Sequence, residues 1–315
     1  MTEPLETVQP TRRHLITLDG MSATQITALL DRAADLRMQF RDGARALPLL
    51  TDRTVFNLFF EPSTRTRASF DLAARRLGAQ VINFDIANSS TGKGESLEDT
   101  LATLEAMDAD AFVVRHQTNG TPERLAAHAR QAVVINAGDG NHAHPTQGLL
   151  DALTIRDRKG SIEGLKVTIC GDIRHSRVAR SDVHALRALG VGEIRLCGPR
   201  PFWPDDNELV DCEISDDFDA AITDVDVVIM LRIQIERIVS PQILDVVPNY
   251  SAHYRLDGAR LSRAASDALV MHPGPMNRGL EIASEVADGP QSMILDQVAN
   301  GVFVRMAVLA DLLDA

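Results

Sequence analysis

Apolar and polar positions along the chain switch repeatedly between the two-residue period of a strand and the longer period of a helix. A capping-box pattern, Ser22-Ala-Thr-Gln25, predicts a helix that runs to about residue 40. A later helix has one apolar face at i, i+3, i+4 and i+7 and closes at Gly78. Strands are expected at 54–60, 81–86, 111–115 and 132–136, with helices at 97–107, from 122 and from 145. This alternation predicts a parallel sheet with crossover helices.

The second half of the chain repeats the alternation. Strands are expected at 166–170, 193–196, 226–231 and 268–272, with a helix at 177–189 and a final apolar helix at 293–313. The charged, glycine-containing stretch 157–166 is the expected boundary, and 315 residues fit two ordinary domains. We therefore predict an α/β protein with domains 1–157 and 158–291, each a parallel sheet with helices on both faces. The C-terminal helix, within 292–315, is expected to cross back to the first domain.

Composition narrows the classes of partner and location. The formal net charge is −12 and the sequence pI about 5.2, which disfavours nucleic acid and leaves small anions held by local cation clusters. The three cysteines form no C-x-x-C pair, and no apolar run has the length of a signal or membrane segment. We expect a cytoplasmic protein that does not enter a membrane.

Unusual polar residues follow each strand of the first half, and the carboxyl ends of parallel strands meet at one edge. The first group, Ser63-Thr-Arg-Thr-Arg67, begins a helix, where each cation costs about 0.3 to 1 kcal/mol unless an anion is bound. Ser63 can cap the helix, Arg65 can clamp two oxygens, and the hydroxyls of Thr64 and Thr66 complete a phosphate or carboxylate site. The alternative is a surface helix start with salt bridges. The other groups are 89–94, 115–116 and 141–147.

Histidines and glycines leave further alternatives. His144 fits a helix cap or a neutral imidazole that polarises a carbonyl group. His142 and His144 make a poor metal pair because no carboxylate or third histidine stands at ligand spacing. No G-x-G-x-x-G follows a strand, and Thr91-Gly-Lys-Gly94 lacks the rest of a P-loop. We expect neither a metal nor a nucleotide cofactor.

The second half offers a second anion site. Arg177 follows one strand, and Arg232 and Gln234 share one face after another. Two arginines from two strand ends suit a dicarboxylate, although ordinary surface arginines are the alternative. His272-Pro-Gly-Pro275 is a rigid turn whose carbonyl oxygens could accept from an amine.

In this order, the motifs identify a family. The sequence resembles aspartate carbamoyltransferase catalytic chains, within the aspartate/ornithine carbamoyltransferase superfamily, over nearly its whole length. The resemblance rests on Ser63-Thr-Arg-Thr-Arg67, Lys93-Gly-Glu95, Arg115, His144-Pro-Thr-Gln147, Gly171-Asp172 with Arg177, Arg232-x-Gln234 and His272-Pro-x-Pro275. Ornithine carbamoyltransferases share the first motif, so it indicates carbamoyl phosphate. The last two motifs, with no cysteine beside His272, indicate aspartate.

The resemblance implies transfer of the carbamoyl group from carbamoyl phosphate to the α-amine of L-aspartate, giving N-carbamoyl-L-aspartate and phosphate in de novo pyrimidine biosynthesis, without a cofactor. It implies that carbamoyl phosphate is bound by Ser63, Thr64, Arg65, Thr66, Ser90, Lys93, Arg115, His144 and Gln147. It assigns aspartate to Lys93, Arg177, Arg232, Gln234, Gly274 and Pro275, and catalysis to Arg65, Thr66, Lys93, Arg115 and His144.

The resemblance also implies a homotrimer with shared active sites, in which the loop with Ser90 and Lys93 reaches a neighbouring subunit. Whether Ser89 or Ser90 makes that contact is open. Gly274 stands where many relatives have leucine, and a larger assembly with dihydroorotase or regulatory chains is left open. The rival functions are a carbamoyltransferase for ornithine or another amine, and a silent family member that serves as an assembly partner. The intact basic residues of the motifs argue against silence.

Overall fold

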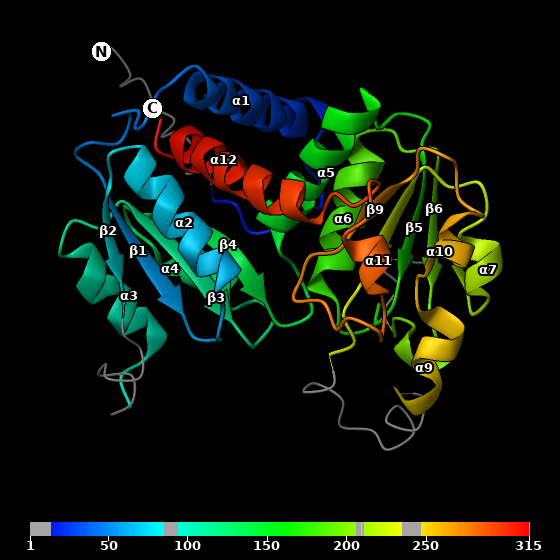
Figure 1. Cartoon of the computed structure of the whole chain (residues 1–315). Coiled ribbons are helices and arrows are strands. Elements are labelled where there is room, and N and C mark those ends of the chain that lie inside the picture. Colours follow the sequence, from blue (N-terminus) through cyan, green and yellow to red (C-terminus); the bar gives the residue numbers. More distant parts are fainter. Residues whose placement is uncertain (1–13, 85–93, 206–208, 210, 235–246, 315) are drawn as a thin grey trace, which may run out of the picture.

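Two parallel sheets flanked by helices make up the molecule (Figure 1). The structure is a computed structural model that describes residues 14–84, 94–205, 209, 211–234 and 247–314. The first sheet has the strand order β2-β1-β3-β4 and the second the order β7-β6-β5-β8-β9. Each strand pair within these sheets is parallel, as the alternation predicts. The predicted two-domain α/β fold is confirmed.

The elements of the first sheet follow the expected order closely. The helices and strands are α1 (Ala23–Arg41), β1 (Thr54–Phe59), α2 (Arg65–Arg76), β2 (Gln80–Asn83), α3 (Leu97–Glu105), β3 (Ala111–His116), α4 (Thr121–His128) and β4 (Val133–Asp139). The capping box at the start of α1 is present, with Ser22 and Gln25 each accepting from the other's backbone N–H. The expected strand 81–86 is β2, and its last two residues lie outside the described residues.

Helix α5 (Pro145–Lys159) leads from the first sheet to the second. The elements that follow are β5 (Lys166–Cys170), α6 (Arg177–Ala188), β6 (Glu193–Cys197), a short 3-10 helix (Arg200–Phe202), β7 (Glu213–Ser215), α7 (Phe218–Ala221), β8 (Val227–Met230), α9 (Val247–Tyr254), α10 (Gly258–Leu261), β9 (Leu269–Met271), α11 (Ser284–Ala287) and α12 (Ile294–Leu312). The sequence pattern did not predict β7, α9 or the shortest helices, most of which have too few residues to show a measurable period.

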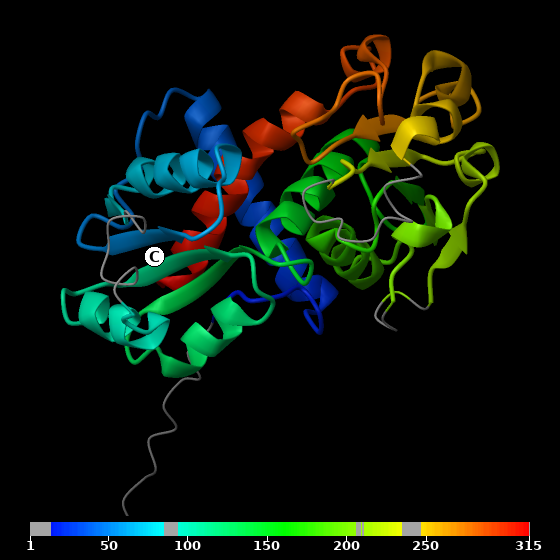
Figure 2. The same ribbon diagram turned by 90° about the horizontal axis from the view of Figure 1, so that it is seen from below.

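The hydrophobic core explains how the two sheets are held together. Side chains of β1, β3 and β4 alternate between a cluster under α3 and α4 and a larger cluster under α1, α2, α5 and α12. The larger cluster continues through α5 and α6 onto one face of the second sheet. Helix α12 runs from the second sheet back across the first and packs on α1, α2 and α5 (Figures 1 and 2). The predicted return of the C-terminal helix is therefore confirmed.

Among the described residues, no helix combines the length and the apolar character needed to cross a membrane.

Candidate active site

A cavity of about 710 Å³ lies where the carboxyl ends of the first sheet face the second sheet. It brings together most of the predicted site residues, namely Ser63, Thr64, Arg65, Thr66, Arg115, His144, Gln147, Arg177, Arg232, Gln234, Gly274 and Pro275. Ser90 and Lys93 lie outside the described residues. The cavity thus joins residues from both sheets, as expected from convergent strand ends.

The first turn of α2 forms one wall of the cavity. Its N-cap is Thr64, which already has right-handed helical dihedral angles and makes no side-chain cap hydrogen bond. The expectation that Ser63 caps this helix is wrong, because the cap position is Thr64. The hydroxyls of Ser63 and Thr64 line the cavity beside the first N–H groups of the helix. Such a helix start is suited to binding an anion.

His144 lies at the N-cap position of α5, but its imidazole makes no cap hydrogen bond. The side chain is buried, with Nε2 at 3.5 Å from Oγ1 of Thr66. Burial, and then the positive charges of Arg115, Arg177 and Arg305, hold the pKa of His144 well below its usual range. The imidazole is therefore neutral near pH 7. Its Nδ1 has no hydrogen-bond partner in the described part of the chain.

A neutral imidazole offers one donor and one acceptor, which suits a carbonyl group better than a phosphate. The residues that the structure describes contain no group of three or more His, Cys, Asp or Glu side chains that could hold a metal ion.

Glu61 joins the two arginines on the floor of the cavity. Its Oε1 accepts from Nη2 of Arg115 at 2.8 Å and from Nη2 of Arg177 at 2.7 Å, and its Oε2 accepts from Nη1 of Arg177 at 3.1 Å. Sequence reasoning missed this residue, although it directly precedes Pro62-Ser63 in a strongly cationic motif. Glu61 therefore holds both guanidinium groups in place.

Gly138, near the end of β4, was also missed. Its φ of +118° lies in the region that favours glycine, and a Cβ there would lie 3.0 Å from Cζ and Nε of Arg177. The same atom would lie 3.3 Å from Nη1 of Arg115. The absence of a side chain at Gly138 therefore lets both arginines lie against the strand end.

Asp172 organises the wall formed by the second sheet. Its Oδ1 accepts from the backbone N–H of His175 at 3.2 Å, and its Oδ2 accepts from that of Gln234 at 3.2 Å. The side chain of Gln234 donates to the carbonyl oxygen of His175 at 2.7 Å.

Burial, and then the positive charge of Arg232, lowers the pKa of Arg65. The electrostatic contact shows that arginines of the two domains face the same space.

The predicted turn at 272–275 closes the cavity. Nδ1 of buried His272 accepts from the backbone N–H of Gly274 at 2.8 Å, so Nε2 bears the proton and lies 3.2 Å from Oε1 of Glu281. Gly274 has a φ of +64°, and a Cβ there would lie 3.1 to 3.3 Å from the guanidinium of Arg65. The missing side chain at Gly274 leaves room for Arg65.

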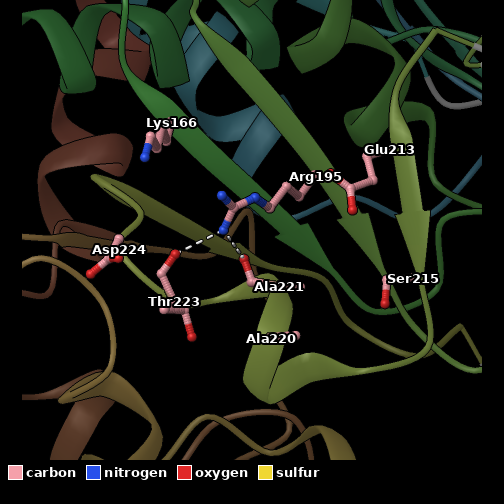
Figure 3. Close-up of a pocket in the computed structure, with 8 residues that line it drawn as sticks. All are labelled: Lys166, Arg195, Glu213, Ser215, Ala220, Ala221, Thr223 and Asp224. Atoms are coloured by element: carbon pink, nitrogen blue, oxygen red, sulfur yellow. Dashed lines mark hydrogen bonds between the residues drawn. The ribbon is translucent and has the colours of Figure 1, made fainter.

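A smaller cavity of about 320 Å³ lies beside β6, near the first residues of β5 and β7 (Figure 3). The guanidinium of Arg195 extends across it and donates to the carbonyl oxygens of Ala221 and Thr223 at 3.3 and 2.8 Å. Glu193 accepts from the same guanidinium at 2.7 Å. Since Arg195 is committed to partners within the chain, this cavity does not share the chemistry of the larger one.

Comparisons with known proteins point to the same two substrate-binding domains whose residues line the larger cavity. Residues 13–157 match the carbamoyl-P binding domain of the aspartate/ornithine carbamoyltransferases, and residues 163–312 match their Asp/Orn binding domain. The aspartate carbamoyltransferase catalytic subunit of Xanthomonas campestris pv. campestris strain B100 is 55% identical over 303 residues, covering 96% of each chain.

Solved structures show the same fold. Aspartate transcarbamoylase from Trypanosoma cruzi, in complex with carbamoyl phosphate and aspartate, matches with a TM-score of 0.87 at 32% identity, covering 95% of this chain and 96% of that one. Ornithine carbamoyltransferase from Pyrococcus furiosus matches with a TM-score of 0.85 at 27% identity, over 95% and 96% of the two chains. The resemblance found in the sequence is confirmed: this chain belongs to the aspartate/ornithine carbamoyltransferase family.

Proposed function

We propose that this chain transfers the carbamoyl group of carbamoyl phosphate to the α-amine of L-aspartate, giving N-carbamoyl-L-aspartate and phosphate for pyrimidine biosynthesis. One observation supports this most strongly: the anion-binding start of α2 and the two arginines Arg177 and Arg232 line the same cavity. A phosphate and a dicarboxylate therefore have separate cationic partners within one space. The names of the Xanthomonas and Trypanosoma relatives support the same reaction.

The phosphate group of carbamoyl phosphate is assigned to the first turn of α2. Backbone N–H groups and the hydroxyls of Ser63 and Thr64 would donate to its oxygens, and Arg65 would bind two of them in a fork. The partial positive charge of the helix N-terminus favours the same anion. Arg65 and Lys93 would stabilise the phosphate as it leaves.

The carbamoyl group is assigned to the residues deeper in the cavity. Thr66, Arg115 and neutral His144 would donate to the carbonyl oxygen as it gains negative charge. Gln147 would accept from the carbamoyl NH₂ group through its amide oxygen. The lowered pKa of His144 supports this role, because a neutral imidazole does not compete for the phosphate.

Aspartate is assigned to Arg177, Arg232 and Gln234, with the carbonyl oxygens of the turn at Gly274 and Pro275 beside its amine. The neutral amine nitrogen forms a bond to the carbonyl carbon, and the bond from that carbon to the phosphate oxygen breaks. The departing phosphate takes the bonding electrons and accepts the proton of the amine. Holding two anions in attacking geometry can supply on the order of 7 to 11 kcal/mol of the acceleration.

We assign Ser90 and Lys93 to the active site of a neighbouring subunit in a homotrimer. Exposed apolar side chains beside the cavity support a subunit contact there. Leu72 and Val298 line the cavity and are 40% and 46% exposed. Leu295, on the same helix as Val298, is 80% exposed. Dihydroorotase or regulatory chains would add to this trimer. We place the protein in the cytoplasm.

We place the carbamoyl phosphate-binding domain at residues 1–157, together with the C-terminal helix within 292–315, and the aspartate-binding domain at 158–291. The matches to the two family domains, which end at 157 and begin at 163, support this division.

The test is release of phosphate from carbamoyl phosphate by the purified chain, with L-aspartate and L-ornithine supplied in parallel. The Arg65→Ala variant serves as the control for spontaneous decomposition of carbamoyl phosphate. We expect release with aspartate alone. Release with ornithine alone would overturn the aspartate assignment, and no release with either would leave a non-catalytic assembly role.

A further inference from the structure

Two buried carboxyl groups lie beneath the cavity, outside the set of groups assigned to substrate. Asp151 is on α5, one turn after Gln147, and Asp182 is on α6, five residues after Arg177. Each residue is 1% exposed. Helices α5 and α6 pack against each other, so the two carboxyl groups meet where the helices join. Two adjacent carboxylates in such a site would repel strongly.

Asp151 is a hydrogen-bond acceptor for amides from two helices. Nε2 of Gln147 lies 3.1 Å from each of its oxygens, and Nε2 of Gln297, on α12, lies 2.6 Å from Oδ1. The amide oxygen of Gln297 in turn accepts from the backbone N–H of His272 at 2.9 Å. Asp151 therefore fixes which end of the Gln147 amide faces it. The amide oxygen of Gln147 is left to accept from a ligand in the cavity.

Asp182 has a different environment. Neither of its oxygens meets an N–H or hydroxyl donor in the described part of the chain. Its polar neighbour is the Asp151 carboxyl group. A carboxylate buried in this way without a donor would be costly, whereas a protonated carboxyl group can donate to Asp151.

We propose that Asp151 and Asp182 share one proton, with Asp182 as the donor, and that this carboxyl pair positions the amide of Gln147 for the carbamoyl group. The identity of the group that Gln147 binds, the carbamoyl group, rests on the proposed function. The proposal makes Asp151 and Asp182 positioning residues, since neither lines the cavity.

Electrostatics support the same distribution of charge. Burial and the negative charge of Asp151 raise the pKa of Asp182 well above its usual range, which favours the protonated form of Asp182. Burial raises the pKa of Asp151 to about 6, against hydrogen bonds from Gln297 and Gln147. The titratable and charged groups that act on Asp151 are Asp182 from α6 and the Arg305 cation from α12. We therefore expect the pair to have one proton and one negative charge at pH 8.

The first test needs no substrate. Infrared spectra of the full chain at pH 8 should contain the carbonyl band of a protonated carboxylic acid. This band should be lost in Asp182→Asn and retained in Asp31→Asn, a surface variant on α1. A wild-type spectrum without the band, or a band that survives in Asp182→Asn, would overturn the shared proton whatever the protein catalyses.

The second test separates positioning from general damage. Asp151→Asn should lower kcat/KM for carbamoyl phosphate by roughly ten- to a hundredfold, because the Gln147 amide loses its fixed orientation. Affinity for inorganic phosphate should be unchanged, since phosphate binds at α2. Asp182→Asn, which keeps a donor, should lose far less kcat/KM than Asp182→Leu, which has none.

Equal weakening of phosphate and carbamoyl phosphate in Asp151→Asn would overturn the positioning role, as would equal losses in the two Asp182 variants. If the wild-type chain releases no phosphate with aspartate, the proposed function fails, and the infrared test still decides whether the proton is shared.

Discussion

Oε1 of Glu61 lies 2.7 Å from Nη2 of Arg177, across a sequence separation of 116 residues. The same oxygen lies 2.8 Å from Nη2 of Arg115. Glu61 therefore occupies two guanidinium groups that we assign to aspartate and to the carbamoyl group. A substrate anion must compete with this internal carboxylate before it binds.

Glu61→Gln should tighten the binding of L-aspartate, the anion that we assign to Arg177. The change removes the internal competitor and one negative charge, so the dissociation constant measured by calorimetry should fall by roughly fivefold. Glu98→Gln is the matched control, because Glu98 pairs with Arg124 at 2.7 Å and does not line the cavity. Unchanged aspartate affinity in Glu61→Gln would mean that Glu61 does not compete with this ligand.

His144→Ala should lower kcat by roughly 100- to 1000-fold, as expected for the loss of one oxyanion donor. Its effect on carbamoyl phosphate binding should be smaller, because the phosphate contacts remain. The wild-type pH profile should show no step from His144 near pH 6.5, since burial and nearby arginines keep its pKa well below that value. The exposed His128→Ala serves as a control, and an unchanged kcat in His144→Ala would remove this residue from the mechanism.

Gly138→Ala should damage activity more than its backbone strain explains. The new Cβ would contact the Arg177 guanidinium at 3.0 Å, so kcat/KM for aspartate should fall by at least about tenfold. Gly160→Ala is the matched control, because Gly160 also has a positive φ, +79°, but has nothing within 4 Å of the added atom. Both variants should lose about 1 kcal/mol of stability from the strain. Steady-state kinetics and thermal unfolding give both quantities, and equal kinetic losses would refute the steric argument.

Mixing subunits tests the proposed sharing of active sites. Arg65→Ala and Lys93→Ala should each be inactive alone, because each removes a group that stabilises the leaving phosphate. After dissociation and reassociation together, some sites would combine an intact Arg65 with an intact Lys93 from the neighbour. Activity should then reappear, and mixed oligomers of verified composition that stay inactive would exclude sharing.

Asp182→Asn should stabilise the protein, and more so at higher pH. The raised pKa of Asp182 means that the folded state binds a proton which the unfolded state releases above about pH 3.9. The contribution of Asp182 to the free energy of unfolding of the wild type therefore falls as pH rises. Asparagine removes this dependence, so the difference in Tm between variant and wild type should be larger at pH 8 than at pH 5. A difference that does not change with pH would show that Asp182 is not protonated in the fold.

Local periodicity predicted most of the fold because each strand and helix of ordinary length shows its own period in the sequence. The cation-rich strand ends also predicted the cavity, since parallel strands bring their carboxyl ends together. Three features of the site join residues that are distant along the chain. They are the pairing of Glu61 with Arg177, the space at Gly138 and the contact of Asp182 with Asp151. Such contacts have no local signal, and a single sequence does not reveal them.

The expected cap at Ser63 failed for a related reason. Its residue type is typical of a cap, but the cap position is Thr64, and no side chain caps this helix. Because Ser63 lines the cavity, its hydroxyl group is available to a bound ligand instead of the helix backbone.

The chain passes between the two sheets twice, once after α5 and once before α12. These two connections, together with the core shared through α5 and α6, limit how far one sheet can slide past the other. Any change in the angle between the two sheets would therefore alter the distance between the wall with Arg65 and the wall with Arg232, and with it the space for the second substrate.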